Sequence, residues 1–190
     1  TDEQKKLSPH YSEDQTSRKG KNFEPVQANL FEVTILPPDG VSGQALFLQH
    51  INSIGGLESL HREVAAVEQK YKFSTRSYAG MPDGTAVDIT VNFSLNLNDS
   101  NEAYLYKSMR EWYRKQYNPE TGEMGLKKDY VGTIVIVQFN RAGDIYRKIT
   151  LDDCFMTSGV GMTGELSYES ADPAVLEIGW RCDVWNEEVN

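Results

Sequence analysis

The sequence contains few of the residues from which catalytic and metal sites are usually built. Only 3 histidines and 2 cysteines occur among 190 residues, and no HExxH, HxxxH or CxxC spacing is present. His10 lies in a polar N-terminal stretch, while His50 and His61 fall in a region without clear periodicity. A zinc site or a nucleophile–histidine triad needs such residues in convergent positions. We therefore expect no metal, no cofactor and no enzymatic activity.

Long apolar runs are also missing. No stretch approaches the roughly 18 apolar residues of a transmembrane helix, and no apolar signal segment is present near the N-terminus. We expect neither membrane insertion nor a secretion signal. Cys154 and Cys182 lie in strand-like surroundings, which favours buried free thiols in a protein assembled inside a cell. A disulfide between the two is the alternative.

Positive charge is scarce outside the first residues. The formal net charge is −9 at pH 7, and residues 1–25 hold five acids and five bases, so the whole excess belongs to residues 26–190. Those residues carry 23 acids against 14 bases, a balance that repels a phosphate backbone and argues against a nucleic-acid-binding protein. Residues 1–25 are polar and lack periodicity. We expect a flexible arm there, followed by one domain over residues 26–190.

Alternation of apolar and polar residues is the main pattern that is present. Residues 87–97 match a period of two throughout, which predicts one long strand. Its apolar face is Val87, Ile89, Val91, Phe93, Leu95 and Leu97. Its polar face is Asp88, Thr90, Asn92, Ser94 and Asn96. The closing strand alternates in the same way, with Leu176, Ile178, Trp180, Cys182 and Val184 on its apolar face and Glu177, Arg181 and Asp183 on the other.

Further strands are predicted at residues 31–35, 67–78, 130–139 and 145–155. The segment 67–78 alternates through Val67, Tyr71, Phe73 and Thr75, so we expect a single strand that turns only at residues 79–84. The last two strands form a hairpin around residues 140–144. Residues 57–66 are ambiguous between a short helix and a loop.

One amphipathic helix interrupts the strands. Asp99 and Glu102 have the spacing of a capping box, and Leu105, Met109 and Trp112 form one apolar stripe that should pack on the strands. The order of elements predicts a mainly β protein, an antiparallel β-sandwich or barrel with one flanking α-helix.

Two apparent motifs do not predict a functional site. Gly159, Gly161 and Gly164 fit GxGxxG, but the motif binds a dinucleotide only between a strand and a helix of a βαβ unit, and here the flanking residues are extended. A glycine-rich connection between strands is the better interpretation. Asp152 and Asp153 are neighbours on a strand and point to opposite faces, so they cannot form a paired-carboxylate site alone.

The pattern as a whole resembles a known family. The segments "ANLFEVTI", "DITVNFSLNLNDSNEAYLYKSMREW" and "LSYESADPAVLEIGWRCDVW" follow one another with the order and spacing seen in the tail tube proteins of contractile-tailed bacteriophages of the T4 type. That family extends to the tubes of contractile injection systems. The resemblance covers residues 28–186, and its specificity lies in the combination of segments.

The resemblance implies a β-sandwich protomer whose strands complete an inner β-barrel in a homohexameric ring. Stacked rings would form the conduit through which DNA passes transiently during ejection into the host. The implied partners are further copies of the chain, a sheath protein, a tape-measure protein and baseplate or terminator proteins. The implied location is the virion tail, after assembly in the host cytoplasm.

Within this framework the sequence suggests two functional surfaces. The candidates for the channel wall are Asp88, Thr90, Asn92, Ser94 and Asn96, with the face of Glu177, Arg181 and Asp183 as an equivalent. The segment 51–67 is apolar and interrupted by glycine, so we expect it to reach a neighbouring ring or protomer. Its candidate contacts are Ile54, Gly55, Gly56, Leu57 and Leu60. The alternative function is a monomeric carbohydrate- or peptide-binding module with Tyr11, Tyr130 or Trp185 as its platform.

Overall fold

The computed structural model describes residues 26–42, 50–60, 64–82, 84, 86–95, 105–160, 162–163, 168 and 173–190. The elements are β1 (Phe31–Leu36), β2 (Ile51–Gly55), the 3₁₀ helix η3 (Leu57–Leu60), β3 (Val64–Tyr71), β4 (Ser74–Pro82), β5 (Val87–Ser94), α4 (Leu105–Gln116), α5 (Lys127–Tyr130), β6 (Gly132–Phe139), β7 (Ile145–Met156), β8 (Met162–Thr163) and β9 (Val175–Val189). The predicted mainly β class is confirmed. The arm expected over residues 1–25 lies outside the described residues.

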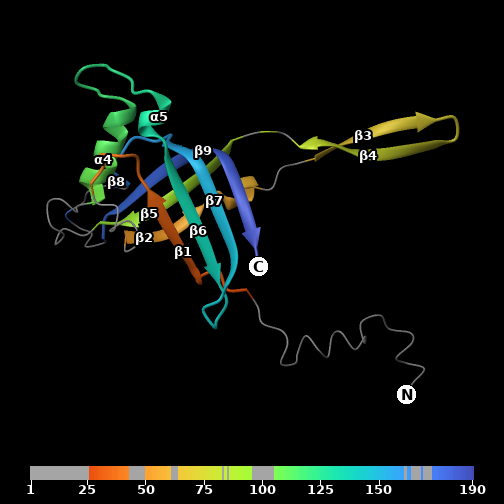
Figure 1. Ribbon diagram of the computed structural model, residues 1–190, viewed down its shortest axis with the longest axis horizontal. Helices are drawn as coiled ribbons and strands as arrows, with labels where there is room; N and C mark the ends of the chain where they lie inside the picture. Colours follow the sequence, from red (N-terminus) through yellow and green to blue (C-terminus); the bar gives the residue numbers. More distant parts are fainter. Residues whose placement is uncertain are drawn as a thin grey trace.

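The strands form one large antiparallel sheet and one separate hairpin. In the large sheet the order is β1-β6-β7-β9-β5-β2, with β8 beside β9. Figure 1 shows that this sheet curves strongly on itself, so that the body is shaped like a barrel that is nearly closed. β1 and β2 are the two ends of the strand order, and each has a described strand partner on one side only.

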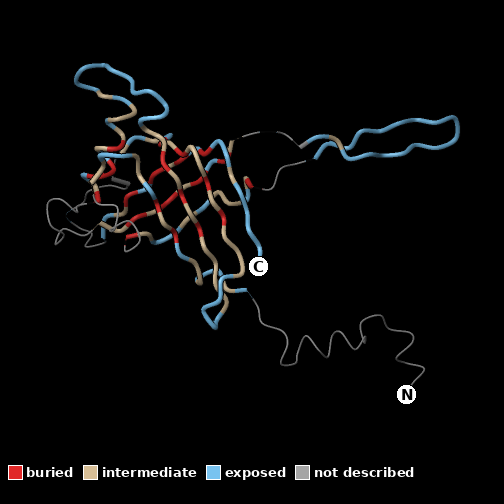
Figure 2. Tube along the Cα trace, in the orientation of Figure 1, coloured by how far each residue is buried: buried red, intermediate tan, exposed pale blue. Residues whose placement is uncertain are grey.

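The concave side of the sheet holds the core. Along β5 every second residue is buried, and the same is true of the first half of β9. The largest fully buried side chains are Trp112, Trp180, Phe93, Ile35, Ile89, Leu105, Met109, Ile134, Ile136, Ile149 and Leu151. Figure 2 shows buried segments of β1, β5, β6, β7 and β9 in this interior.

Helix α4 packs across one end of the sheet (Figure 1). The apolar stripe predicted from the sequence faces inward, because Leu105 is 1% exposed and Met109 and Trp112 are fully buried. The predicted capping residues Asp99 and Glu102 lie outside the described residues. Within the ambiguous segment 57–66, residues 57–60 form the 3₁₀ helix η3 and residues 64–66 belong to β3.

The prediction of one strand over residues 67–78 is wrong. The segment contains the turn of a hairpin at Lys72 and Phe73, and β3 and β4 pair around it from Tyr71 opposite Ser74 to Val64 opposite Pro82. Phe73, which we expected on the apolar face of a strand, is 91% exposed. The turn gave no warning in the sequence because it contains no glycine, asparagine or aspartate, the residues that usually mark a two-residue hairpin turn.

A second correction concerns Val184, which is 53% exposed although the alternation of β9 placed it in the core. β6 and β7 shift register between Gly132 and Ile134, near the left-handed residue Asp153 (φ 54°) of β7. The core-facing positions of β7 change from odd to even residue numbers across this irregularity. β9 pairs with β7 on both sides of this irregularity without a shift in register. The side of β9 that faces the core therefore changes at the same place.

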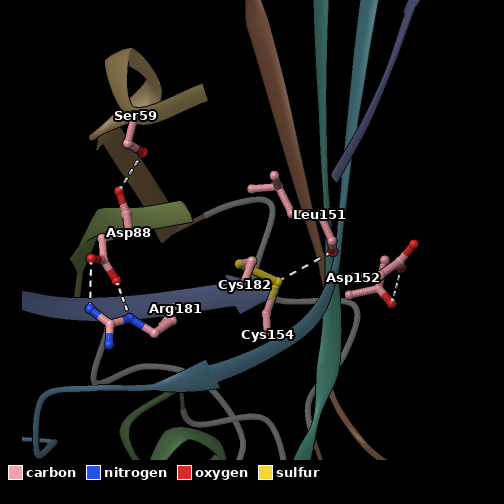
Figure 3. Close-up of a disulfide and its surroundings, with 8 residues drawn as sticks. Ser59, Asp88, Leu151, Asp152, Cys154, Arg181 and Cys182 are labelled. Carbon is pink, nitrogen blue, oxygen red and sulfur yellow. Dashed lines mark hydrogen bonds and ion pairs between the residues drawn. A yellow bond between two sulfur atoms is a disulfide. The ribbon is translucent and has the colours of Figure 1, made fainter. Parts of the chain in front are cut away.

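The two cysteines are not free thiols, and this third expectation is also wrong. Cys154 of β7 and Cys182 of β9 lie directly opposite each other and form a disulfide (Figure 3). Both residues are fully buried. Antiparallel neighbours that face the same side come close enough for such a bond, but their register was not visible from the sequence.

Candidate functional site

The first candidate surface is a polar face on the convex side of the sheet, formed by β2, β5 and β9. We define the polar face as Ser53 of β2, Asp88, Thr90, Asn92 and Ser94 of β5, and Glu177 and Arg181 of β9. The four β5 residues alternate with buried neighbours, which is why they share one side. Asn96, the fifth predicted channel residue, lies outside the described residues.

Hydrogen bonds join the polar face across its strands. The amide of Asn92 donates to the hydroxyl of Ser53 over 3.0 Å, and the amide of Asn52 donates to the hydroxyl of Ser94 over 2.6 Å. β5 lies between β2 and β9, so these bonds connect the middle strand to the end strand. The short side chains therefore hold one another in place across β2 and β5.

Arg181 is the one cation of this face, and Asp88 neutralises it. The guanidinium Nε and Nη2 donate to the two carboxylate oxygens over 2.7 and 2.9 Å, as Figure 3 shows. The hydrogen bond from Arg181 lowers the pKa of Asp88, and the reciprocal hydrogen bond raises the pKa of Arg181. Asp88 is further anchored through its backbone, since the Ser59 hydroxyl donates to its carbonyl over 3.2 Å.

The second predicted surface, in segment 51–67, contains apolar residues that pack against the core of their own chain and two glycines near a turn. Ile54 and Leu57 are partly buried against the core, and Leu60 is only 4% exposed. Leu60 is thus a core residue of its own chain, and its side chain is not available to a neighbour. Gly55 lies in open space, while a Cβ on Gly56 would approach the Asp88 carbonyl oxygen to 2.4 Å. The tight turn at Gly56 therefore seats η3 on β5.

A further exposed apolar feature is the hairpin of β3 and β4, which the sequence did not single out. It projects far from the body in Figure 1, and Figure 2 shows it exposed along nearly its whole length. Its exposed large side chains are Val64, Val67, Tyr71, Phe73, Tyr78 and Met81. A signal was present in retrospect: residues 68–77 are too polar for a strand that packs on a core.

No metal-binding cluster occurs in the part of the chain that the structure describes. Those residues include no group of three histidine, cysteine or acidic side chains that could hold a metal ion. Asp152 accepts a hydrogen bond from Thr133, whereas Asp153 lies 3.8 Å from Lys127, so the two neighbouring acids have separate partners. Of the GxGxxG glycines, Gly161 and Gly164 fall outside the described residues.

Two of the three residues expected as a platform for a carbohydrate- or peptide-binding module, Tyr130 and Trp185, pack against other residues of the described chain. Tyr130 packs edge-on against Phe155 with ring centroids 6.1 Å apart, and Trp185 packs partly buried against the core. Tyr11 lies outside the described residues. Within the described ranges, no helix combines the length and the apolar character needed to span a bilayer.

In the part of the chain that the structure describes, a curved antiparallel sheet, one long helix across its end and a projecting hairpin define a barrel-like β protein. No family model matches the chain, and no curated protein matches it. Solved structures do match. The tube-terminating cap of the anti-feeding prophage aligns with a TM-score of 0.56 and 16% identity, over 88% of this chain and 93% of the other.

Two further structures belong to the same kind of assembly. A chain of the sheath–tube complex of the extracellular contractile injection system PVC aligns with a TM-score of 0.56 and 16% identity, over 92% of this chain and 97% of the other. A chain of the anti-feeding prophage baseplate aligns with a TM-score of 0.53 and 13% identity, over 87% and 97%. The tail-tube fold implied by the sequence resemblance is confirmed.

Proposed function

We propose that this chain is a structural subunit of a tail tube, in which copies associate into hexameric rings and the rings stack into a conduit. The observation that supports the proposal most directly is the extent of the structural alignments. The matches to the sheath–tube complex and to the tube cap extend over nearly the whole of both chains.

The open ends of the sheet support self-association. β1 and β2 each have one described strand partner, and an unpaired edge is a template for another strand. A neighbouring copy that adds its own strands would satisfy these edges, and a ring of copies would remove them altogether. The strands would then form a continuous inner barrel, with the polar face toward its lumen.

The cargo and partners follow from the same proposal. We infer that DNA passes through the lumen during ejection, that a sheath and a tape-measure protein contact the tube outside and inside, and that terminator and baseplate proteins end it. The site of action is a phage tail assembled in the host cytoplasm. A net-negative fold with short polar side chains on the wall supports passage without retention.

Electron microscopy of the purified full chain tests the proposal. Negative-stain images over a range of protein concentrations should show rings or tubes, and sedimentation velocity should show species of six or more copies. A protein that stays monomeric at every concentration would contradict a tube subunit. Analytical ultracentrifugation at several concentrations separates the two outcomes without relying on adsorption to a grid.

A further inference from the structure

The disulfide between Cys154 of β7 and Cys182 of β9 lies on the core side of the sheet, and both residues are fully buried (Figure 3). Thiol–disulfide exchange requires direct attack of one sulfur on another, so a buried sulfur is inert toward oxidants and reductants in solution. The oxidation state of this pair can therefore change in the folded protein only when part of the sheet opens.

The surroundings of Cys154 also suit a free thiol. The Cys154 sulfur lies 3.3 Å from the Leu151 carbonyl oxygen, as Figure 3 shows. A disulfide sulfur carries no hydrogen, whereas a Cys154 thiol would donate a weak hydrogen bond to that carbonyl. Both cysteines also belong to the apolar core, where a thiol packs as a small hydrophobic side chain. The site thus accommodates the reduced pair as well as the bond.

The end of β9 provides a local route to the sulfurs. Residues 183–189 pair with β7 and have no described strand partner on the β5 side. Segments with few buried contacts open more often than the core does. When this segment opens, β7 keeps its pairing with β6 from Ile145 to Cys154, whereas no second strand holds β9 beyond Cys182. Opening therefore carries Cys182 toward solvent and leaves Cys154 on the sheet.

Lys127 of α5 connects the two strands beside the cysteines. Its ammonium donates to the carboxylate of Asp183, the residue that follows Cys182. The same ammonium lies 3.8 Å from the carboxylate of Asp153, the residue that precedes Cys154. All three side chains are partly exposed, so these ion pairs are weak. They resist the opening of β9 without preventing it.

We propose that Cys154 and Cys182 form a reversible redox latch, by which we mean that the chain folds with either a dithiol or a disulfide and that opening of the end of β9 lets the two forms interconvert. A chain that folds in a reducing cytoplasm then holds the dithiol, and it acquires the bond without unfolding when it later meets an oxidising medium. This inference goes beyond the tube proposal and does not depend on it.

The oxidation uses a low-molecular-weight disulfide, RSSR. The Cys182 thiolate attacks one sulfur of the oxidant, so that a mixed disulfide forms and RS⁻ leaves. The Cys154 thiolate then attacks the Cys182 sulfur of the mixed disulfide, so that the protein S–S bond forms and the second RS⁻ leaves. The two thiol protons pass to the two RS⁻ ions. Two protein thiols and one RSSR therefore give one protein disulfide and two RSH.

Reversal of the bond in the full chain tests the latch. The chain is reduced in urea, refolded without air, and exposed to hydroxyethyl disulfide, a neutral oxidant. Mass spectrometry after alkylation counts the thiols, and near-ultraviolet circular dichroism follows the packing of the buried tryptophans. The dithiol chain should keep the native spectrum, and the bond should re-form faster than the reduced chain unfolds globally. Loss of the native spectrum, or re-formation only at the rate of global unfolding, would overturn the proposal.

Two variants with one thiol each test the route. Cys154→Ala leaves Cys182 as the only cysteine, and Cys182→Ala leaves Cys154, so both lack the bond and each has one sulfur. With a neutral pyridyl disulfide, Cys182 in the native protein should react about tenfold or more faster than Cys154, whereas in urea the two rates should agree within about threefold. Equal native rates would show that the end of β9 is not the route.

Two neighbouring lysines supply the control for the connection between the strands. Lys127→Gln and Lys128→Gln remove the same charge from exposed positions. In the Cys154→Ala chain, Lys127→Gln should raise the rate of Cys182 about threefold, the effect of losing exposed ion pairs, and Lys128→Gln should change it by less than about twofold. Loss of a nearby cation alone would slow the reaction, because it disfavours the thiolate. Equal rates in the two variants would remove Lys127 from the proposal.

Failure of the latch and failure of the tube proposal are distinguishable. All rates are compared at a concentration where sedimentation velocity shows one species, so none of them requires self-association. A chain that never forms rings but re-forms its bond in the folded state would overturn the tube proposal and support the latch. A chain that forms rings but re-forms its bond only on global unfolding would do the reverse.

Discussion

Trp112 of α4 and Trp180 of β9 stack at an angle in the core, with ring centroids 4.5 Å apart and planes inclined by 58°. Both side chains are fully buried. The Trp112 indole also donates to the Tyr130 carbonyl over 2.7 Å. This pair therefore connects the helix, the closing strand and the short helix α5, and it fixes the helix on the end of the sheet.

Replacing Trp112 by alanine should lower the free energy of unfolding by about 3–5 kcal/mol, because a large buried side chain and a hydrogen bond are lost together. Urea unfolding followed by circular dichroism measures the change. Arg110→Ala, at an exposed position of the same helix, is the control and should change stability by less than about 0.5 kcal/mol. A loss below about 1 kcal/mol for Trp112→Ala would show that the ring is not in the core.

Gly132→Ala should be destabilising by about 1–3 kcal/mol, the usual effect of overpacking. A Cβ at this position would lie 2.6 Å from both the Leu36 carbonyl oxygen and the Trp112 ring. Gly55→Ala is the matched control in another strand, since its Cβ would meet nothing within 4 Å. If thermal melts give the two variants equal stability, the close approach of β6 to Trp112 is not real.

Reducing or removing the disulfide between Cys154 and Cys182 should lower the free energy of unfolding by about 3–4 kcal/mol, as the chain-entropy model gives for a loop of this length. The double variant Cys154→Ala/Cys182→Ala is compared with the natural chain in urea. In the folded natural protein no thiol should react with iodoacetamide, and two should react after denaturation under reducing conditions. Two reactive thiols in the unreduced, unfolded chain would contradict the bond.

Stability should depend slightly on the ionisation of Asp88. Because Arg181 lowers the pKa of Asp88 in the folded state, the pair adds stability above the ordinary carboxyl pKa of 3.8 and loses it as the pH falls below that value. Both side chains are about half exposed, so the effect at pH 7 should stay below about 1 kcal/mol. Asp88→Asn should cost this amount at pH 7 and nothing near pH 2. An equal difference at both pH values would mean that the charge is not involved.

If the polar face lines the tube, then lysines placed there should hold DNA. Tubes of Thr90→Lys/Asn92→Lys/Ser94→Lys should retain a short double-stranded DNA at low salt and release it at high salt. The control places the same three charges in the exposed loop after α4, as Thr121→Lys/Met124→Lys/Leu126→Lys. Protection of the DNA from nuclease distinguishes an internal site from an external one. Equal protection in both variants would place the polar face outside the lumen.

Strands with a strict period of two, and the helix with one apolar stripe, could be predicted from the sequence because each buries one face in its own chain. The alternation along β5 and the stripe of α4 are of this kind. The order of elements also led to the right fold, since a combination of segments is more specific than any one of them.

The remaining features depend on relations that a single sequence does not contain. The disulfide requires the register of β7 against β9, and the exposure of Val184 requires the irregularity near Asp153. The hairpin was missed for another reason: its aromatic residues alternate as a core strand would, but they face outward. Alternation predicts that one face will be covered, and it does not specify whether the cover belongs to the same copy.

The position of the disulfide has a mechanical consequence. β9 pairs with β7 over residues 180–189 and with β5 over residues 175–182, so residues 183–189 are joined to the sheet on one side only. Cys182 is the last residue of β9 that has both partners (Figure 3). Force applied at the C-terminus would separate the one-sided pairs successively from Val189 and would then meet a covalent bond. Separation of the strands would stop at this disulfide, before it reached the strands that enclose the core.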